Sequence, residues 1–397
     1  MSPVLDIDAL LNDPQTRVIV CCGAGGVGKT TVAAALGLRA AESGRQVVVL
    51  TIDPARRLAQ SLGLTTLDNT PRPVLSIDVA RGGSLDAMML DMKRTFDEVV
   101  MAHAAPDKAE QILANPFYQA VSSSFAGTQE YMAMEKLGQL RLEADRNPDN
   151  PRWDLIVVDT PPSRSALDFL DAPKRLGSFL DGRFIRILAA PAKVGGRAYL
   201  KVFTTGVNIV TTAMTKLLGG QMLTDVQTFV AALDTMFGGF RERADHTYAL
   251  LSDSATKFIV VAAPERDALR EASYFVDRLD EEGMPLAGLV VNRVYRVSAP
   301  GLSAARALAA AEELDDIENG SPSNGRSGVS DSTAITQALL RLHAVQAEIA
   351  GRHQALAKRF IAGHPDIPTV EVPAASQDIH DLVGLRTVGE ALAGQRA

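Results

Sequence analysis

Short runs of apolar and β-branched residues recur along the chain, with longer helical segments between them. The runs cover residues 17–22, 46–52, 74–79, 153–159, 257–263, 286–292 and 367–372. Continuous apolar runs of this length are typical of strands buried on both faces of a parallel sheet, where helices form the crossovers. The pattern therefore predicts an α/β fold, with a mostly parallel sheet flanked by helices.

Two long stretches interrupt this alternation and carry few strand signals. They are residues 84–145 and 170–250, and nine of the eleven methionines lie within them. We expect both stretches to form one helical subdomain, inserted into a single domain that spans residues 1–397. A third irregularity, residues 315–332, is polar and rich in turn-forming residues, which predicts a disordered surface loop.

The first strand ends at Cys22 and leads through a glycine-rich turn into a helix expected from about residue 28 to 43. The turn carries the pattern G-x-x-x-x-G-K-[ST], from Gly23 to Thr30. Its glycines let successive backbone N–H groups point at phosphate oxygens, and the following helix N-terminus adds its positive end. The alternative is a chance glycine-rich turn, but this turn has the strand–turn–helix context that the motif requires.

The residues of this cradle have separate expected roles. Lys29 is expected to neutralise the β- and γ-phosphates, and the Thr30 hydroxyl to complete the shell of a Mg²⁺ ion. The expected nucleotide ligands are Gly23, Gly25, Gly26, Val27, Gly28, Lys29, Thr30 and Thr31. The sequence thus predicts a P-loop nucleoside triphosphatase that uses ATP and Mg²⁺.

Two aspartates follow predicted strands. Asp159 ends an apolar strand, a position suited to holding Mg²⁺ through water, although an aspartate there is also a common capping residue. Asp53 follows the second strand, at the carboxyl edge of the sheet, where ligands bind in such folds. It could position the attacking water, and the alternative is a turn aspartate before proline.

The composition of the chain indicates which partners and which cellular compartment fit the protein. The net charge of -7 argues against a general nucleic-acid binder. The two cysteines, Cys21 and Cys22, are adjacent in a predicted strand, so their side chains point to opposite faces, and a reducing cytoplasm fits best. We expect no signal peptide and no stable membrane insertion, because the uncharged run 202–215 is too short to span a bilayer.

The motifs G-x-G-G-V-G-K-T-T, T-x-D-P-A and D-T-x-P occur here in this order. Together they resemble the deviant Walker A ATPases, and within them the arsenite-pump and tail-anchored-protein-targeting ATPase family. Residues 127–135, 290–293 and 372–379 are similar to further motifs of that family. The resemblance covers residues 17–385. More narrowly, the sequence resembles the actinobacterial members of the family, which occur as paralogous pairs.

The resemblance implies roles for several residues. Asp53 would position the hydrolytic water, Asp159 would lie in the second switch, and Asn292 and Pro373 would frame adenine. Family members act as dimers that close over two ATP molecules, and their helical subdomains then form an apolar groove that opens on hydrolysis. The methionine-rich stretches suit such a groove, and the alternative is that the methionines fill a helical core.

The chain also departs from the family pattern. Ala24 occupies the position of a lysine that reaches into the partner's site, and Ser165 replaces a histidine of the second switch. Hydrolysis is then slow, or another cation such as Arg56 or Arg57 substitutes, or the partner is a paralogue that keeps its lysine. With no cysteines beyond the adjacent pair, neither the arsenite site nor the zinc clamp of the family can be built.

Three functions compete. The first is an ATP-driven chaperone or targeting factor for hydrophobic or membrane-protein segments, acting as a homodimer or heterodimer. The second is a weakly hydrolysing regulatory subunit of a heterodimer with a paralogous ATPase. The third, ranked below both, is a partitioning-type ATPase, which needs a basic patch or a terminal amphipathic helix that residues 387–397 do not show strongly.

Overall fold

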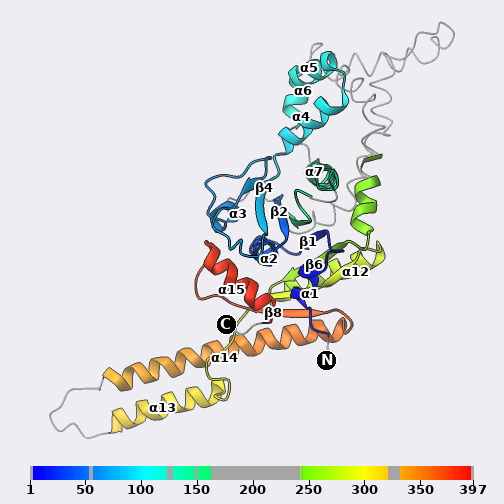
Figure 1. Cartoon of the computed structure of the whole chain (residues 1–397). Helices are drawn as coiled ribbons and strands as arrows, with labels where there is room; N and C mark the ends of the chain where they lie inside the picture. Colours follow the sequence, from blue (N-terminus) through cyan, green and yellow to red (C-terminus); the bar gives the residue numbers. More distant parts are fainter. Residues whose placement is uncertain are drawn as a thin grey trace, which may run out of the picture.

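The computed structural model describes residues 3–52, 57–122, 128–147, 151–161, 242–243, 245–320 and 331–394. An eight-stranded sheet with the order β3-β4-β2-β5-β1-β6-β7-β8 organises these residues (Figure 1). The strands are β1 (Val18–Cys22), β2 (Gln46–Thr51), β3 (Arg72–Pro73), β4 (Ser84–Met89), β5 (Leu155–Asp159), β6 (Thr256–Ala262), β7 (Leu286–Val294) and β8 (Thr369–Pro373). All neighbours pair in parallel except β3 and β4, which confirms the predicted fold class.

Helices cover both faces of this sheet. They are α1 (Ile7–Asn12), α2 (Lys29–Glu42), α3 (Arg57–Ser61), α4 (Met92–His103), α5 (Pro106–Ala114), α6 (Pro116–Ser122), α7 (Thr128–Asp145), α12 (Arg266–Glu281), α13 (Ala304–Gly320), α14 (Asp331–Gly363) and α15 (Leu382–Leu392). Alternate residues of each strand point to opposite faces, so the core has two layers. One layer packs against α1, α2 and α15, and the other against α4, α7, α12 and α14.

The central strand β1 lies between β5 and β6, and all five of its residues are buried. Its register aligns Cys21 with Asp159 of β5, and β2 in turn aligns Thr51 with Asp159. The strands run in parallel, so their carboxyl ends meet at one edge of the sheet. This edge is where the glycine-rich turn begins.

The prediction of a strand at residues 74–79 is wrong, and the expected helical start at residue 84 is corrected to Met92. The strand that pairs with β2 on this side of the sheet is instead β4, which begins at Ser84. Local sequence favoured the first segment because it is apolar, yet it is not paired as a strand and its Leu75 is 87% exposed. The true strand has no continuous apolar run, because it contains the charged Asp86. The Asp86 carboxylate accepts a hydrogen bond from the Trp153 indole N–H at 3.0 Å.

Four helices, α4 to α7, follow β4, and Figure 1 shows α4, α5 and α6 stacked beyond that end of the sheet. Residues 162–241 lie outside the described residues, and they contain most of the second stretch assigned to the helical subdomain. The insertion of one helical subdomain from both stretches therefore stays a prediction. Among the helices of the described ranges, none is long and apolar enough to cross a bilayer.

The two helices α13 and α14 form a hairpin at the opposite end of the molecule (Figure 1). The polar segment 315–332 was expected to be a loop, but α13 continues to Gly320 and α14 starts at Asp331. The helix persists because the Asp315 carboxylate accepts from Gln337 of α14 at 2.9 Å and pairs with Arg341. Residues 321–330 lie outside the described residues.

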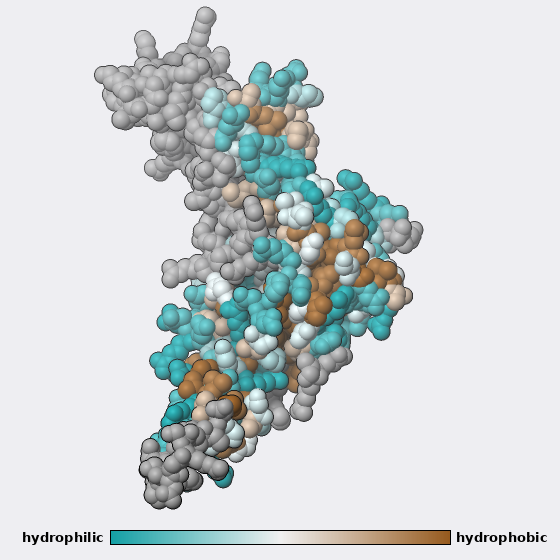
Figure 2. All heavy atoms as spheres, turned by 90° about the vertical axis from the view of Figure 1, so that its left-hand side faces the viewer, coloured by the Kyte–Doolittle hydropathy of each residue, from teal (hydrophilic) through white to brown (hydrophobic). Residues whose placement is uncertain are grey.

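The hairpin exposes apolar side chains along one side of α14. Figure 2 shows apolar surface at the lower end of the molecule, where this arm lies. The exposed residues are Ile335, Leu339, Leu342 and Val345, each more than half exposed. Their spacing of three and four residues places them on neighbouring turns of the helix.

Candidate nucleotide-binding site

The glycine-rich turn between β1 and α2 adopts a backbone that side chains would not tolerate. Gly23, Gly26 and Gly28 have φ values of 147°, 76° and 95°, in the region that favours glycine. A Cβ atom on Gly23 would lie 2.0 Å from the carbonyl oxygen of Val261 in β6. The turn is therefore pressed against the sheet at its start and must have glycine there.

The helix α2 begins directly at Lys29, and no side chain caps its N-terminus. Its first N–H groups and the positive end of the helix dipole are thus directed at the turn, which is the physical basis of phosphate binding at such sites. Lys29 is 6% exposed, and its ammonium donates to the Ala24 carbonyl at 2.9 Å. The loop therefore holds the positive charge of Lys29 close to its own backbone.

A buried carboxylate lies beside the first turn of α2. Asp159, at the end of β5, is fully buried and accepts from the Thr30 hydroxyl at 2.7 Å and from the Thr51 hydroxyl at 2.8 Å. Three neighbouring segments of the sheet edge thus contribute oxygen atoms to one point. Carboxylate and hydroxyl oxygens are hard ligands that suit Mg²⁺, either directly or through its waters.

Ala24 stands where the family that the motifs resemble carries a lysine, and it differs from that lysine in its position as well as in its charge. Ala24 is 7% exposed, and its methyl group packs in the core layer that faces α2. It therefore brings no charge to the surface of the turn.

The two cysteines of β1 are buried, as their apolar run suggested. Burial raises the pKa of the Cys22 thiol to about 12, and burial together with the nearby Asp159 carboxylate raises the pKa of Cys21 well above its usual range. Both thiols are therefore protonated at neutral pH. A protonated thiol is a poor nucleophile and metal ligand, so these residues serve packing.

A pocket of about 550 Å³ extends from the turn towards β8. Its walls include Gly28, Thr30 and Thr31 of the cradle, Asn292, Arg293 and Tyr295 at the end of β7, and residues 372–375 and 377–380. The structure thus brings the two expected adenine neighbours, Asn292 and Pro373, to the same cavity as the cradle. Their contact with adenine stays a prediction.

Most of the segment 372–379, which resembles a family motif, lines this pocket. His380 and Tyr295 carry no expectation from the sequence, and Arg293 belongs to the similar segment 290–293 but has no expected role of its own. The position of Arg293 next to Asn292 does not predict a role in the pocket, because adjacent residues of a regular strand point to opposite faces of the sheet.

Asp53 lies outside the described residues, as do Arg56 and Ser165. The residue before Asp53 is described: the Ile52 N–H donates to the Asp159 carbonyl at 3.0 Å. The chain therefore leaves β2 next to Asp159, and the water-positioning role of Asp53 stays a prediction.

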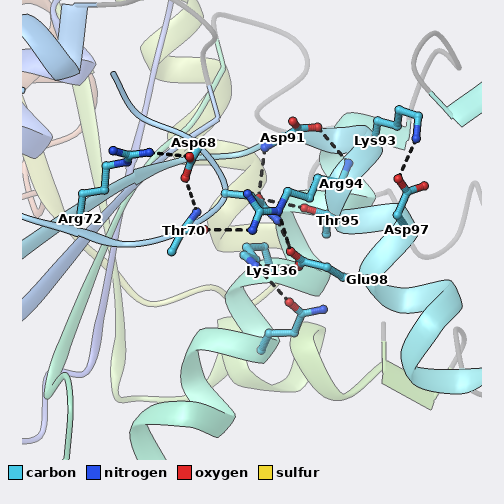
Figure 3. Close-up of polar contacts among 12 residues, drawn as sticks. Asp68, Thr70, Arg72, Asp91, Lys93, Arg94, Thr95, Asp97, Glu98 and Lys136 are labelled. Carbon is cyan, nitrogen blue, oxygen red and sulfur yellow. Dashed lines mark hydrogen bonds and ion pairs between the residues drawn. The ribbon is translucent and has the colours of Figure 1, made fainter. Parts of the chain in front are cut away.

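A polar network joins the segment 68–72 to the helices α4 and α7 (Figure 3), and a backbone hydrogen bond links the start of α4 to the carboxyl edge of the sheet. The Leu90 N–H donates to the Thr51 carbonyl at 2.9 Å, and the next residue, Asp91, caps α4. Asn69 is 2% exposed; its side-chain carbonyl accepts from the N–H of Asp91, and its amide donates to Glu98 at 3.1 Å. Lys136 of α7 donates to the same Glu98 carboxylate at 3.0 Å.

The strand–glycine turn–helix cradle, with Lys29 and Thr30 beside the strand-end Asp159, defines the site of a P-loop nucleoside triphosphatase. The model of the anion-transporting ATPase family matches residues 16–320, and the chain belongs to this family. The match confirms the family inferred from the motifs and places the chain in a family of ATPases.

Similar proteins carry related names. ATPase BagA of Mycobacterium tuberculosis is 29% identical over 42% of this chain and 48% of its own length. ATPase GET3C of Arabidopsis thaliana is 24% identical over 70% of this chain and 67% of its own length. The arsenical pump-driving ATPase of Acidiphilium multivorum is 28% identical over 40% of this chain and 26% of its own length. The chain spans less than half the length of the first mycobacterial relatives that it matches.

Proposed function

We propose that this protein is a Mg²⁺-dependent ATPase that acts as a nucleotide-driven dimeric switch in the cytoplasm. The observation that carries the proposal is the meeting of the cradle with the Asp159 carboxylate and the Thr30 hydroxyl. Lys29 and the first N–H groups of α2 would bind the β- and γ-phosphates. Thr30 and Asp159 would hold Mg²⁺, which supplies positive charge to the phosphates during hydrolysis.

Asp53 is the proposed positioning residue for the attacking water. Replacement of Asp53 by Asn is expected to lower ATP turnover by about 100-fold or more, because general-base assistance contributes roughly 10²- to 10⁴-fold. ATP affinity is expected to stay unchanged, since the cradle is intact. Turnover assays and calorimetric titration with ATP measure the two effects.

Asp267→Asn is the matched control, because this aspartate lies on α12 with its side chain 83% exposed. It makes the same chemical change away from the cradle and is expected to leave turnover and affinity unchanged. Retained turnover in Asp53→Asn would remove this residue from the mechanism.

The network beyond Thr51 supports a switch. A change at Asp159 would reach the end of β2 through Thr51, then Leu90, and then Asp91 at the N-terminus of α4, because hydrogen bonds join these consecutive segments. Asn69 and Glu98 extend this connection to α7. Few contacts separate the proposed metal site from the helices, so an altered nucleotide state has a short physical path to them.

The proposed client is a hydrophobic or membrane-protein segment, which the methionine-rich stretches and the family resemblance favour. A fluorescent apolar helical peptide is expected to bind the full-length protein with an affinity that depends on whether ATP, ADP or no nucleotide is present. Crosslinking followed by mass spectrometry is expected to find the peptide on residues 185–240. Equal binding in all three states, with no crosslink in that range, would reject a client role.

The buried methyl group of Ala24 favours a second candidate, a weakly hydrolysing subunit of a heterodimer with a paralogous ATPase. A lysine supplied by the partner would then complete this chain's site, whereas this chain would not complete the partner's. ATP turnover of the purified chain, alone and mixed with the paralogue, separates the candidates. Full turnover of the chain alone would exclude the regulatory role.

A further inference from the structure

The end of β7 contains an irregularity that faces the cradle. Leu289, Val290 and Val291 pair in regular register with Thr369, Val370 and Glu371 of β8, but the next pair is Val294 with Pro373. β7 therefore advances by three residues while β8 advances by two. The extra residue creates a β-bulge at Asn292 and Arg293, a device that often redirects side chains next to functional sites.

Arg293 has a φ of 60°, and among the residues that the structure describes it alone combines a positive φ with a side chain. This left-handed conformation costs free energy in a residue that carries a Cβ. Contacts made by the guanidinium must offset that cost, since the residue is otherwise exposed. A strained residue beside a ligand pocket is a reason to look for a role in the site.

The bulge lets two consecutive side chains reach the cradle. In a regular strand Asn292 and Arg293 would point to opposite faces of the sheet. Here the Asn292 amide donates to the Val27 carbonyl at 2.8 Å, and the Arg293 guanidinium donates to the Gly26 carbonyl at 2.9 Å. Two successive carbonyls of the phosphate loop are thus held from one strand end.

Holding these carbonyls also orients the N–H groups of the loop. In a trans peptide the C=O of one residue and the N–H of the next point in opposite directions, and the described chain has no cis peptide. Fixing the carbonyls of Gly26 and Val27 on the β7 side therefore turns the N–H groups of Val27 and Gly28 away from β7. N–H groups of such loops are the ligands of phosphate oxygens.

The loop needs this support unequally along its length. A Cβ atom on Gly28 would lie 2.3 Å from the Asn292 amide, so packing already restricts that residue. A Cβ atom on Gly26 would meet nothing within 4 Å, so close packing at the Cβ position does not hold this glycine in place. The hydrogen bond from Arg293 is a restraint on a glycine that packing leaves loose.

We propose that Arg293, aided by Asn292, is a positioning residue for the nucleotide phosphates, a role that rests on the proposed ATPase function. It acts through the Gly26 carbonyl and preorganises the loop, and it does not read the base. Preorganisation favours every ligand that fills the cradle with phosphate and is indifferent to one that carries none. The inference therefore concerns nucleoside di- and triphosphates as a class.

The test uses the full-length variant Arg293→Gly, because glycine accepts the positive φ while it removes the guanidinium. By calorimetry, ATP and ADP are expected to bind about 10-fold more weakly, because ordering the loop then opposes binding; a 10-fold change corresponds to about 1.4 kcal/mol. Adenosine is expected to bind as it does to the wild type. Arg293→Lys retains one donor and is expected to recover part of the loss. Arg296→Gly, an exposed arginine three residues away, is the matched control and is expected to have no effect.

Hydrogen exchange without nucleotide gives an independent readout. The amides of Val27 and Gly28 are expected to exchange faster in Arg293→Gly than in the wild type or in Arg296→Gly. An equal loss of affinity for adenosine and ATP would show that Arg293 contacts the base, and unchanged exchange with unchanged affinity would show that it positions nothing. Absence of ATP binding in the wild type would instead reject the proposed function, while the exchange rates would still decide whether Arg293 orders the loop.

Discussion

Replacement of Gly23 by alanine is expected to destabilise the whole protein and to abolish nucleotide binding. The new Cβ would lie 2.0 Å from the Val261 carbonyl oxygen, which belongs to a strand at the centre of the sheet and has no room to move. The φ of 147° adds backbone strain. Overpacking and strain together cost about 3 kcal/mol or more. Urea denaturation followed by the fluorescence of the buried Trp153 measures the loss in the free energy of unfolding.

Gly26→Ala is the matched control for this effect. Its φ of 76° also disfavours a side chain, but a Cβ there meets nothing within 4 Å. Only the backbone term remains, so the expected loss is about 1–2 kcal/mol. Equal losses in the two variants would show that the contact with Val261 does not decide the stability of the turn.

The second large effect is expected from Asp159→Asn. The amide keeps the shape of the side chain and can still accept a hydrogen bond, but it lacks the negative charge that attracts Mg²⁺. Turnover is expected to fall by about 10²- to 10³-fold, the range seen when one preorganised electrostatic group is removed from a transition state. Steady-state assays over a Mg²⁺ titration measure this loss.

The wild type in the presence of EDTA supplies an internal comparison. Asp159→Asn with Mg²⁺ is expected to bind ATP about as weakly as the wild type without Mg²⁺. In both cases the positive charge of Mg²⁺ is missing beside the phosphates. Thr51→Val removes a hydroxyl that donates to the same carboxylate and is expected to have a smaller effect. If the turnover of Asp159→Asn keeps the Mg²⁺ dependence of the wild type, residues other than Asp159 hold the metal.

Much of the fold could be predicted because its signals are local. Strands β1, β2, β5, β6, β7 and β8 lie within about two residues of their apolar runs, since buried parallel strands need apolar side chains on both faces. The cradle could be predicted for the same reason, because a glycine pattern between a strand and a helix determines the local backbone conformation. Asp159 was located by its place at a strand end, and the structure puts it beside Thr30.

The errors came where a neighbour, and not the local pattern, decides the structure. β4 contains Asp86, whose carboxylate is satisfied by the Trp153 indole and the Arg152 guanidinium, more than 60 residues further along the chain. The end of α13 looked like a loop because its helix depends on Gln337 and Arg341 of α14. Composition cannot report contacts of that kind.

The sequence by itself determined six strands of the sheet, the phosphate cradle and the family, because a run of apolar residues and a short glycine motif are properties of neighbouring residues. The tertiary structure alone decided how Asn292 and Arg293 act. A strand pattern assigns them to opposite faces, and only the bulge against β8 turns both towards the carbonyls of Val27 and Gly26. The reason is physical: register depends on the strand that pairs, and that partner lies about 80 residues further along the chain.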